Sequence, residues 1–437
     1  MCGCVEQTLF KRMSNTQGRT INKVSNLKVQ SLFENGVKVA GLMGFVLATL
    51  AYSPAAFAED ATVIAPQSGQ STVSTNSDED KLKASAFVGM RGRTQNDRVQ
   101  GGQVLGLVSL ITVHYPIAKN FESDLVLKLY AESGSAQSFY SDAYSPHSGI
   151  SLFDFYLTWK PVERTYIKFG AITAREITDM NLRTDILFSD VSMPAISEGW
   201  HIVKNENFTL KLVAAQAIPV TDTKSTIPTS KESVPFFNTE RILADIKVSD
   251  RLSIEPSVAH FSFKDLPGSV ASQSWALGNS IIGQKDDAAF RYLFEGIDSQ
   301  LRFKFKASER VRPSVDLAYL VNLRAPNGLN KAANVSLKSE IDINSDVTLI
   351  PKVDFFRAEA DASPAFYKQD PWPSFYHTAP VGQGNRQGYS LGTRALIKSS
   401  SLTIDGRYEQ SIAIDQNSYQ SDFWGVLFMV GKAIHIM

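Results

Sequence analysis

The most constraining feature of the chain is a strict alternation of apolar and polar side chains. In ANVSLKSEIDINSDV (333–347), every second residue up to position 343 is apolar except Ser339, and the residues between them include Lys338, Glu340 and Asp342. Residues two apart in a β-strand lie on the same face. One face of this strand is therefore apolar and the other is charged, and the two faces need different surroundings.

The same alternation recurs about sixteen times after Lys81, and helical periodicity is hard to find there. The approximate centres of these segments are residues 88, 109, 127, 155, 169, 200, 213, 244, 258, 299, 318, 338, 353, 394, 407 and 429. Tight connections such as KNEN (204–207) and NSD (344–346) follow the even-numbered segments, whereas most of the other connections are long.

This asymmetry of the connections decides between two all-β folds. A β-sandwich also alternates apolar and polar residues, but it has no reason to place its tight turns at one end. A transmembrane barrel does, and it must close because every backbone amide in a bilayer needs a partner. The sequence therefore predicts an all-β fold, a closed antiparallel transmembrane β-barrel of about 16 strands with short periplasmic turns and long extracellular loops. Its apolar face would lie against lipid and its charged face would enclose water.

The N-terminal region has the features of an export signal. KVAGLMGFVLATLAYSPAAFAED (38–60) combines a basic residue, a short apolar run and a small-x-small site, which predicts a signal peptide over 1–58, cut after Ala58. A short N-terminal anchor is the alternative, and the true start could lie later, at Met13. Residues 59–80 are rich in Ser, Thr, Gln and Asp and predict a flexible periplasmic tether, which leaves 81–437 for the barrel.

Net charge and cysteine content give two limited conclusions. The chain has 44 basic and 44 acidic residues, so its net charge gives no argument for nucleic-acid binding. Its two cysteines, Cys2 and Cys4, precede the predicted cleavage site, so the exported chain would have no disulfide.

The stretch LFDFYLTWKPVERTYIKFGAI (152–172) resembles a hairpin of the bacterial outer-membrane porins, with an aromatic residue at each membrane rim. The resemblance covers roughly 81–437 and is architectural. It implies a barrel in the outer membrane of a Gram-negative bacterium, in contact with its lipid and inserted by the barrel assembly machinery. It further implies passive diffusion of small hydrophilic solutes or ions, and it leaves a homotrimer open. One departure is the C-terminus, VGKAIHIM (430–437), which does not end in the aromatic residue typical of such barrels.

The charged face of the segments supplies the candidate pore lining, because rings of charged side chains set the potential inside a pore. The candidates are Arg91, Arg93, Lys128, Asp154, Lys168, Arg302, Lys304, Lys338, Glu340, Arg394 and Arg407. A wider set of charged residues expected on the same face includes Lys211, Arg241, Lys352, Asp124, Asp298, Asp316 and Asp354. The alternative is that these charges only pair across strands and hydrate a wall.

The connection AREITDMNLRTDILFSDVSMPAI (174–196) is the candidate constriction, since the corresponding loop of the porins folds inward. Its charged candidates are Glu176, Asp179, Arg183, Asp185 and Asp190. The resemblance implies that its acidic residues face a basic wall across the channel. An ordinary surface loop is the alternative.

Two further features give weaker hypotheses. FYKQDPWPSFYHT (366–378) gathers aromatic residues that could stack on a sugar or a partner, but such a cluster is more often a loop's own small core. No zinc-type spacing, nucleophile motif or phosphate loop occurs, so we predict no enzyme, no catalytic residue, no metal and no cofactor. A non-transporting barrel in adhesion or surface structure, and a soluble secreted all-β protein, remain the alternatives to a porin.

Overall fold

The computed structural model describes residues 82–436, with gaps at 97–99, 135–136, 139–147, 179–185, 188–191, 220–231, 285–286, 369–383, 418–419 and 421. The predicted signal peptide (1–58) and tether (59–80) lie outside the described residues. Within the described part of the chain, no helix is both long and apolar enough to cross a membrane.

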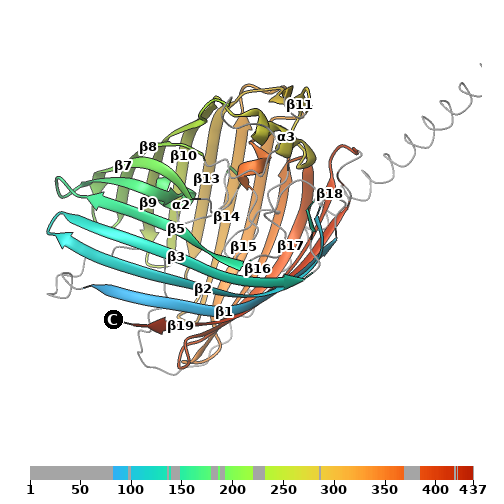
Figure 1. Cartoon of the computed structure of the whole chain (residues 1–437). Coiled ribbons are helices and arrows are strands. Elements are labelled where there is room, and N and C mark those ends of the chain that lie inside the picture. The colour runs from blue at the N-terminus through green and yellow to red at the C-terminus, as the bar shows by residue number, and fades with distance from the viewer. Residues whose placement is uncertain are drawn as a thin grey trace, which may run out of the picture. The chain divides into compact units, whose positions relative to one another are not determined.

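The described residues form one large antiparallel sheet with sixteen long strands (Figure 1). These are β1 (Lys83–Asn96), β2 (Gln100–Ala118), β3 (Phe121–Gly134), β5 (Ser148–Trp159), β6 (Thr165–Thr173), β7 (Ser192–Lys204), β8 (Phe208–Ala217), β9 (Phe236–Ser249), β10 (Leu252–Lys264), β13 (Phe294–Phe305), β14 (Val311–Asn322), β15 (Lys331–Asp342), β16 (Val347–Ala358), β17 (Arg386–Ile397), β18 (Leu402–Ala413) and β19 (Phe423–His435). Each of the sixteen predicted centres falls in one of them. The prediction of an all-β fold with about 16 strands is confirmed.

The sheet closes on itself, because the last strand pairs with the first. β19 is antiparallel to β1 over most of the length of both, from Ser85 opposite His435 to Asn96 opposite Trp424. Every other long strand pairs with its neighbours in chain order. A closed cylinder has no unpaired edge, so the backbone donors and acceptors of all strands are provided with partners.

The two ends of the barrel differ in what connects the strands. At one end, here called the turn end, β2 joins β3 through residues 119–120 and β7 joins β8 through 205–207. β1 also starts at this end and β19 finishes there. The connections at the opposite end, here called the loop end, hold the remaining elements. These are β4 (Gln137–Ser138), α2 (Ala174–Thr178), α3 (Gly268–Ala276), β11 (Ile281–Ile282), β12 (Ala289–Phe290) and η4 (Ala365–Lys368).

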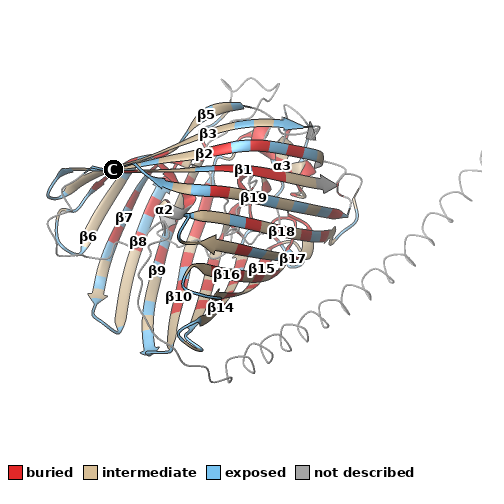
Figure 2. Ribbon diagram, turned by 90° about the horizontal axis from the view of Figure 1, so that it is seen from below, coloured by how far each residue is buried: buried red, intermediate tan, exposed pale blue. Residues whose placement is uncertain are grey.

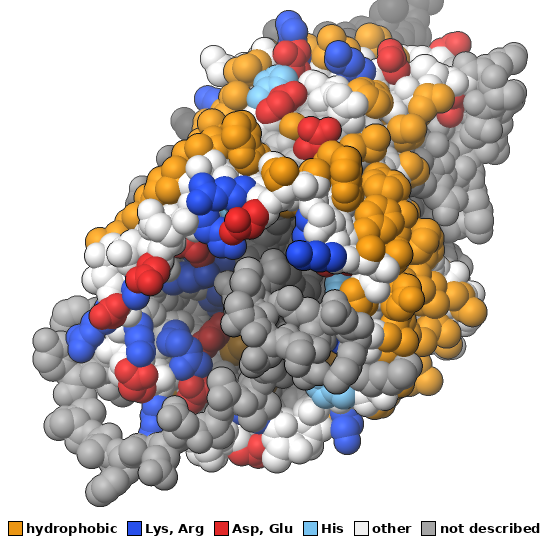
Figure 3. Space-filling view, turned by 90° about the vertical axis from the view of Figure 1, so that its left-hand side faces the viewer, with side chains coloured by type: hydrophobic (Ala, Val, Ile, Leu, Met, Phe, Trp, Pro, Cys, Tyr) orange, Lys and Arg blue, Asp and Glu red, His pale blue; other side chains and the backbone are white. Residues whose placement is uncertain are grey.

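The wall of the barrel separates apolar from polar side chains as the alternation predicts. On β9 the inward Arg241 is 1% exposed, whereas the outward Ile242 next to it is 54% exposed. Buried and exposed residues alternate in this way along many of the strands (Figure 2). Viewed toward the turn end, hydrophobic side chains cover much of the outer wall and charged side chains gather around the opening (Figure 3).

The alternation is interrupted on β5. Alternation places Phe153 on the outer face of β5 together with Phe155, but Phe153 is the extra residue of a β-bulge, because the register jumps there from Asp154 to Leu152. The outward positions beyond the bulge belong to Leu152 and Ile150, which are exposed. A bulge shifts the side-chain period by one residue, and periodicity alone does not reveal where that happens.

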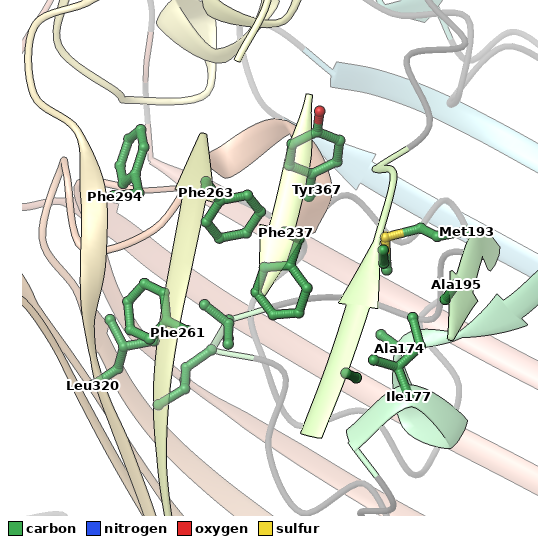
Figure 4. Close-up of a cluster of buried hydrophobic side chains, with 14 of the residues drawn as sticks. Ala174, Ile177, Met193, Ala195, Phe237, Phe261, Phe263, Phe294, Leu320 and Tyr367 are labelled. Atoms are coloured by element: carbon green, nitrogen blue, oxygen red, sulfur yellow. The ribbon is translucent and has the colours of Figure 1, made fainter. Parts of the chain in front are cut away.

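The loop end of the barrel contains a hydrophobic core. Inward side chains of β5 to β10 and β13 to β16 pack there with residues of α2, α3 and η4, and Figure 4 shows Phe237, Phe261, Phe263, Phe294 and Tyr367 gathered among them. The inner face is therefore apolar near the loop end. Elsewhere the inner face carries charged residues such as Arg302 and Arg394, together with apolar ones such as Val104 and Val108 of β2.

We expect this core to contribute strongly to the stability of the barrel. Two leucines near the end of β14 test that contribution. Leu320 of β14 is 0% exposed within the core, whereas Leu323, just after that strand, is 63% exposed. Leu320→Ala should lower the free energy of unfolding by about 2–5 kcal/mol. Leu323→Ala should change it by less than about 1 kcal/mol. Urea unfolding followed by tryptophan fluorescence measures both, and equal losses would contradict an interior core.

Candidate pore

The inner wall of the barrel is held by ion pairs between adjacent strands. Arg302 on β13 donates to both carboxylate oxygens of Asp316 on β14, with Nε to Oδ1 at 2.5 Å and Nη2 to Oδ2 at 3.1 Å. Glu255 on β10 lies on the other side of Arg302 and also pairs with Lys304. A two-pronged arginine–carboxylate contact fixes the orientation of both partners.

The same arrangement occurs four strands further along the wall. Arg394 on β17 donates from Nε and Nη2 to Asp405 on β18, at 2.6 and 2.7 Å. Arg407 donates to Glu409 on its own strand at 3.0 Å. All four side chains are almost fully shielded from solvent.

Strand register places five of the basic residues in one row around the wall. Lys304 lies opposite Ser314, which lies opposite Lys338, and Lys338 lies opposite Lys352. The row continues across Gly392 to Arg407, and then across Leu427 to Arg93. Like charges on neighbouring strands repel each other, so such a row attracts anionic partners.

A second row of opposite sign runs beside it, one inward position nearer the loop end. It passes from Glu255 through Arg302 to Asp316, and then across Ser336 to Asp354. Ser390 follows, and then Glu409. Because cations and carboxylates lie next to each other in the two rows, their charges largely compensate over short distances along the wall.

Arg91 illustrates how a glycine makes such a pair possible. Its Nη2 lies 2.6 Å from Oε1 of Glu132, although β1 and β3 are separated by β2. The residue between them on β2 is Gly106, opposite Arg91 on one side and Glu132 on the other. A Cβ at Gly106 would lie 2.9 Å from Cγ of Glu132, so a larger residue would displace this carboxylate.

The predicted constriction connection enters the barrel where the structure describes it. Ile177 of α2 is completely buried, and its carbonyl accepts a hydrogen bond from Oγ of Ser197, an inward residue of β7. Glu176 pairs with Lys168 of β6, Oε2 to Nζ at 2.5 Å. Asp179, Arg183, Asp185 and Asp190 lie outside the described residues.

Next to Glu176 the wall carries two lysines held against aromatic rings. Nζ of Lys211 lies 4.5 Å from the centroid of the Tyr166 ring, and Nζ of Lys168 lies 5.5 Å from the same ring. Gly199 provides the space, since a Cβ there would lie 2.1 Å from the ring of Tyr166. Cation–π contacts of this kind hold the ammonium groups close to the wall.

Three more of the predicted pore-lining residues contact neighbouring side chains or backbone groups of the wall. Lys128 lies over the ring of Phe153. Asp154 accepts a hydrogen bond from the Thr173 backbone N–H at 2.6 Å, and Glu340 pairs with Arg312 at 3.4 Å. The wider set also contains Arg241 and Asp298, which form an ion pair at 2.5 Å with both side chains 0% exposed.

The candidate set misses several acidic residues. Glu132, Asp405 and Glu409 already stand at polar positions of alternating segments, so the alternation could have found them. Glu255 is hidden in the sequence because Pro256 follows it and breaks the usual appearance of a strand. Of the aromatic stretch 366–378, Phe366 and Tyr367 pack against or within the core, whereas Trp372, Phe375, Tyr376 and His377 lie outside the described residues.

Comparison with solved structures identifies the fold. OprB of Pseudomonas putida, in its high-pH structure, superposes with a TM-score of 0.51 at 11% sequence identity, covering 80% of this chain and 94% of that one. The chain has the fold of an outer-membrane porin. OccK5 (OpdH) of Pseudomonas aeruginosa also matches, with a TM-score of 0.41 and 12% identity, covering 82% and 98% of the two chains.

The sequence itself is far from known relatives. No protein-family model matches the chain, and no curated protein matches it. The likeness to porins is therefore a likeness of fold. Among the described residues, no group of three or more His, Cys, Asp or Glu side chains is placed to hold a metal ion.

The buried pair on β17 and β18 gives a test of the wall. Asp405→Ala would leave Arg394 buried without its carboxylate, which should lower the free energy of unfolding by about 3 kcal/mol. The double variant Arg394→Met with Asp405→Leu should recover most of that loss, because it leaves no unpaired charge. Asp250→Ala, which breaks an exposed pair with Lys247, is the control and should have no measurable effect. A double variant as unstable as Asp405→Ala would contradict this view of the pair.

Proposed function

We propose that the chain forms a water-filled channel in the outer membrane of a Gram-negative bacterium, for passive diffusion of small hydrophilic solutes or ions. The observation that carries the proposal is the reversal of polarity across a single closed wall, apolar outside and charged inside. Only a lipid surrounding and an aqueous interior suit both faces together. Barrels of this strand number are wide enough to leave an aqueous channel.

The proposal extends to the surroundings of the barrel. Export through a signal peptide cut after Ala58 is proposed from the basic residue, apolar run and small-x-small site of the N-terminal region. Insertion by the barrel assembly machinery is what the porin likeness implies, and a homotrimer is compatible with it. Outer-membrane fractionation and N-terminal sequencing of the exported chain, expected to begin at Glu59, examine the first of these.

A barrel that does not transport is the second candidate, in adhesion or as a structural surface protein. The hydrophobic core inside the loop end favours it, because that core occupies part of the lumen. Conductance separates the two candidates. Purified protein in a planar lipid bilayer should give stepwise ohmic currents if the barrel is a channel. A stably folded barrel that stays silent would remove the channel proposal.

The acidic residues of the constriction connection should favour cations in the channel. Replacing Asp179, Asp185 and Asp190 together by asparagine removes three negative charges without a large change of shape. The reversal potential in a salt gradient should shift toward lower cation preference, since fewer carboxylates attract cations. Asp250→Asn at the turn end is the control with no expected shift. An unchanged reversal potential in the triple variant would mean that these three carboxylates do not line the channel.

A single carboxylate on the outer wall tests whether that wall meets lipid. Glu198 is exposed at the middle of β7, on the outward face between Ile196 and Trp200. In lipid this group is costly, so Glu198→Leu should raise the free energy of unfolding in vesicles by about 1–2 kcal/mol. Glu240→Leu serves as the comparison, because Glu240 is already paired with His260. A loss of stability in Glu198→Leu would show that a protein partner, such as another copy in a trimer, covers this face.

A further inference from the structure

Three connections from distant parts of the sequence meet inside the loop end of the barrel. The first lies between β6 and β7. It contributes α2 (Ala174–Thr178), Ile186 and Leu187, which are here called the inward residues. The second is 265–284, which contains α3 and runs from the end of β10. The third is 359–368, here called the bracing segment, which follows β16 and contains η4. All three contribute to the core inside the barrel or bond to residues that do.

Asn279, just after α3, attaches the second connection to the bracing segment. Its side-chain amide donates to the carbonyls of Ala360 and Ser363, at 2.5 and 3.1 Å. Its side-chain oxygen accepts from the backbone N–H of Ala365 at 2.7 Å. Asn279 is 3% exposed, so these three bonds replace water for a fully buried amide.

Asp361 and Asn322 fix the bracing segment to the barrel wall. One carboxylate oxygen of Asp361 accepts from the backbone N–H of Ser280 at 2.8 Å, and the carbonyl of Asp361 accepts from Nδ2 of Asn322 at 2.8 Å. Asn322 ends β14, and its Nδ2 also donates to the carbonyl of Leu293, just before β13. Burial raises the pKa of Asp361. The bracing segment is thus joined to two neighbouring strands.

The bracing segment in turn contacts the inward residues. Oγ of Ser363 donates to the carbonyl of Ile186 at 2.9 Å, across 177 positions of sequence. Ser363 is 0% exposed, so its hydroxyl has no competing water. Beside it, Tyr367 stacks on Phe263 of β10 with ring centroids 5.8 Å apart and planes at 6° (Figure 4).

The inward residues are therefore held from two opposite directions. The wall of β6 and β7 holds α2 through Lys168 and Ser197. The bracing segment holds Ile186 from the side of β14 and β16. A chain segment fixed at one side only would be free to move back toward its own wall, whereas one fixed at both sides stays across the lumen.

We propose that Ser363 and Asn279 are positioning residues that set the width of the channel, by holding the inward residues across the lumen through the bracing segment. This inference rests on the proposed channel function. It assigns the size limit of the channel to a connection on the far side of the barrel, 177 positions along the chain from the residues it holds.

The experiment compares Ser363→Ala and Asn279→Ala with the unchanged chain in planar bilayers and in liposomes. Single-channel conductance is measured first, and then the rate of liposome swelling with neutral sugars of increasing size. Both variants should shift conductance upward and the size limit toward larger sugars, more strongly for Asn279→Ala because it loses three hydrogen bonds. Ser400→Ala at the turn end is the matched control, because its hydroxyl also donates to a backbone carbonyl, that of Ile397, but takes no part in the bracing segment, so this variant should behave as the unchanged chain does.

Two further measurements distinguish a misfolded variant from one that has lost only the bracing contact. Heat-modifiable migration on gels shows whether each variant is a folded barrel, and Ser363→Ala removes only one buried hydroxyl. Hydrogen exchange at Ile186 and Leu187 should be faster in Ser363→Ala. If the unchanged chain conducts and both variants match it in conductance, size limit and exchange, the bracing role is wrong. If the unchanged chain is silent, the channel proposal and the width assignment both fail, and exchange at Ile186 and Leu187 then decides only whether the contact is formed.

Discussion

The pairing of β1 with β19 is the interaction on which the rest of the structure depends. It joins the two ends of a long antiparallel sheet over twelve opposed residue pairs, from Ser85 with His435 to Asn96 with Trp424. A sheet that closes has an inside and an outside, whereas an open sheet has only two faces exposed to the same solvent. Closure therefore places the two faces of the alternating strands in different surroundings. The apolar residues of each strand become one outer surface and the polar residues become one enclosed surface.

The enclosed surface remains polar because its charges neutralise one another across strands. Arg302 with Asp316 and Arg394 with Asp405 are two-pronged contacts between neighbours, and Arg91 reaches Glu132 over a glycine. Since each contact joins two strands, the ion pairs also fix the register of the wall. Along this surface the row with Lys304, Lys338 and Lys352 lies beside a row that holds Asp316 and Asp354.

The loop end of the barrel follows a different rule from the remainder of the lumen. Phe237, Phe261 and Phe294 point inward and are shielded by α2, α3 and η4, so that apolar burial replaces hydration there. Connections that return into the barrel can bury their own apolar residues only if the wall offers apolar partners. This is why the inner face changes from charged to aromatic toward the loop end, and it gives the inward residues a fixed support.

Period-two alternation is a local property, so the amino-acid sequence alone predicted the strand content, the approximate centre of every long strand and the polar face of most strands. It also placed Lys338, Arg394 and the other wall charges on the inner face. The alternation did not locate the bulge at Phe153, where a single extra residue exchanges the two faces. Nor did it separate the charges that meet the lumen from Arg241 and Asp298, which are covered.

The folded barrel was needed to see which charges pair, that Gly106 lets Arg91 reach Glu132, and that Ser363 contacts Ile186. These contacts depend on strand register and on the path of the returning connections. Both are set by closure of the whole barrel and leave no periodic trace in the chain.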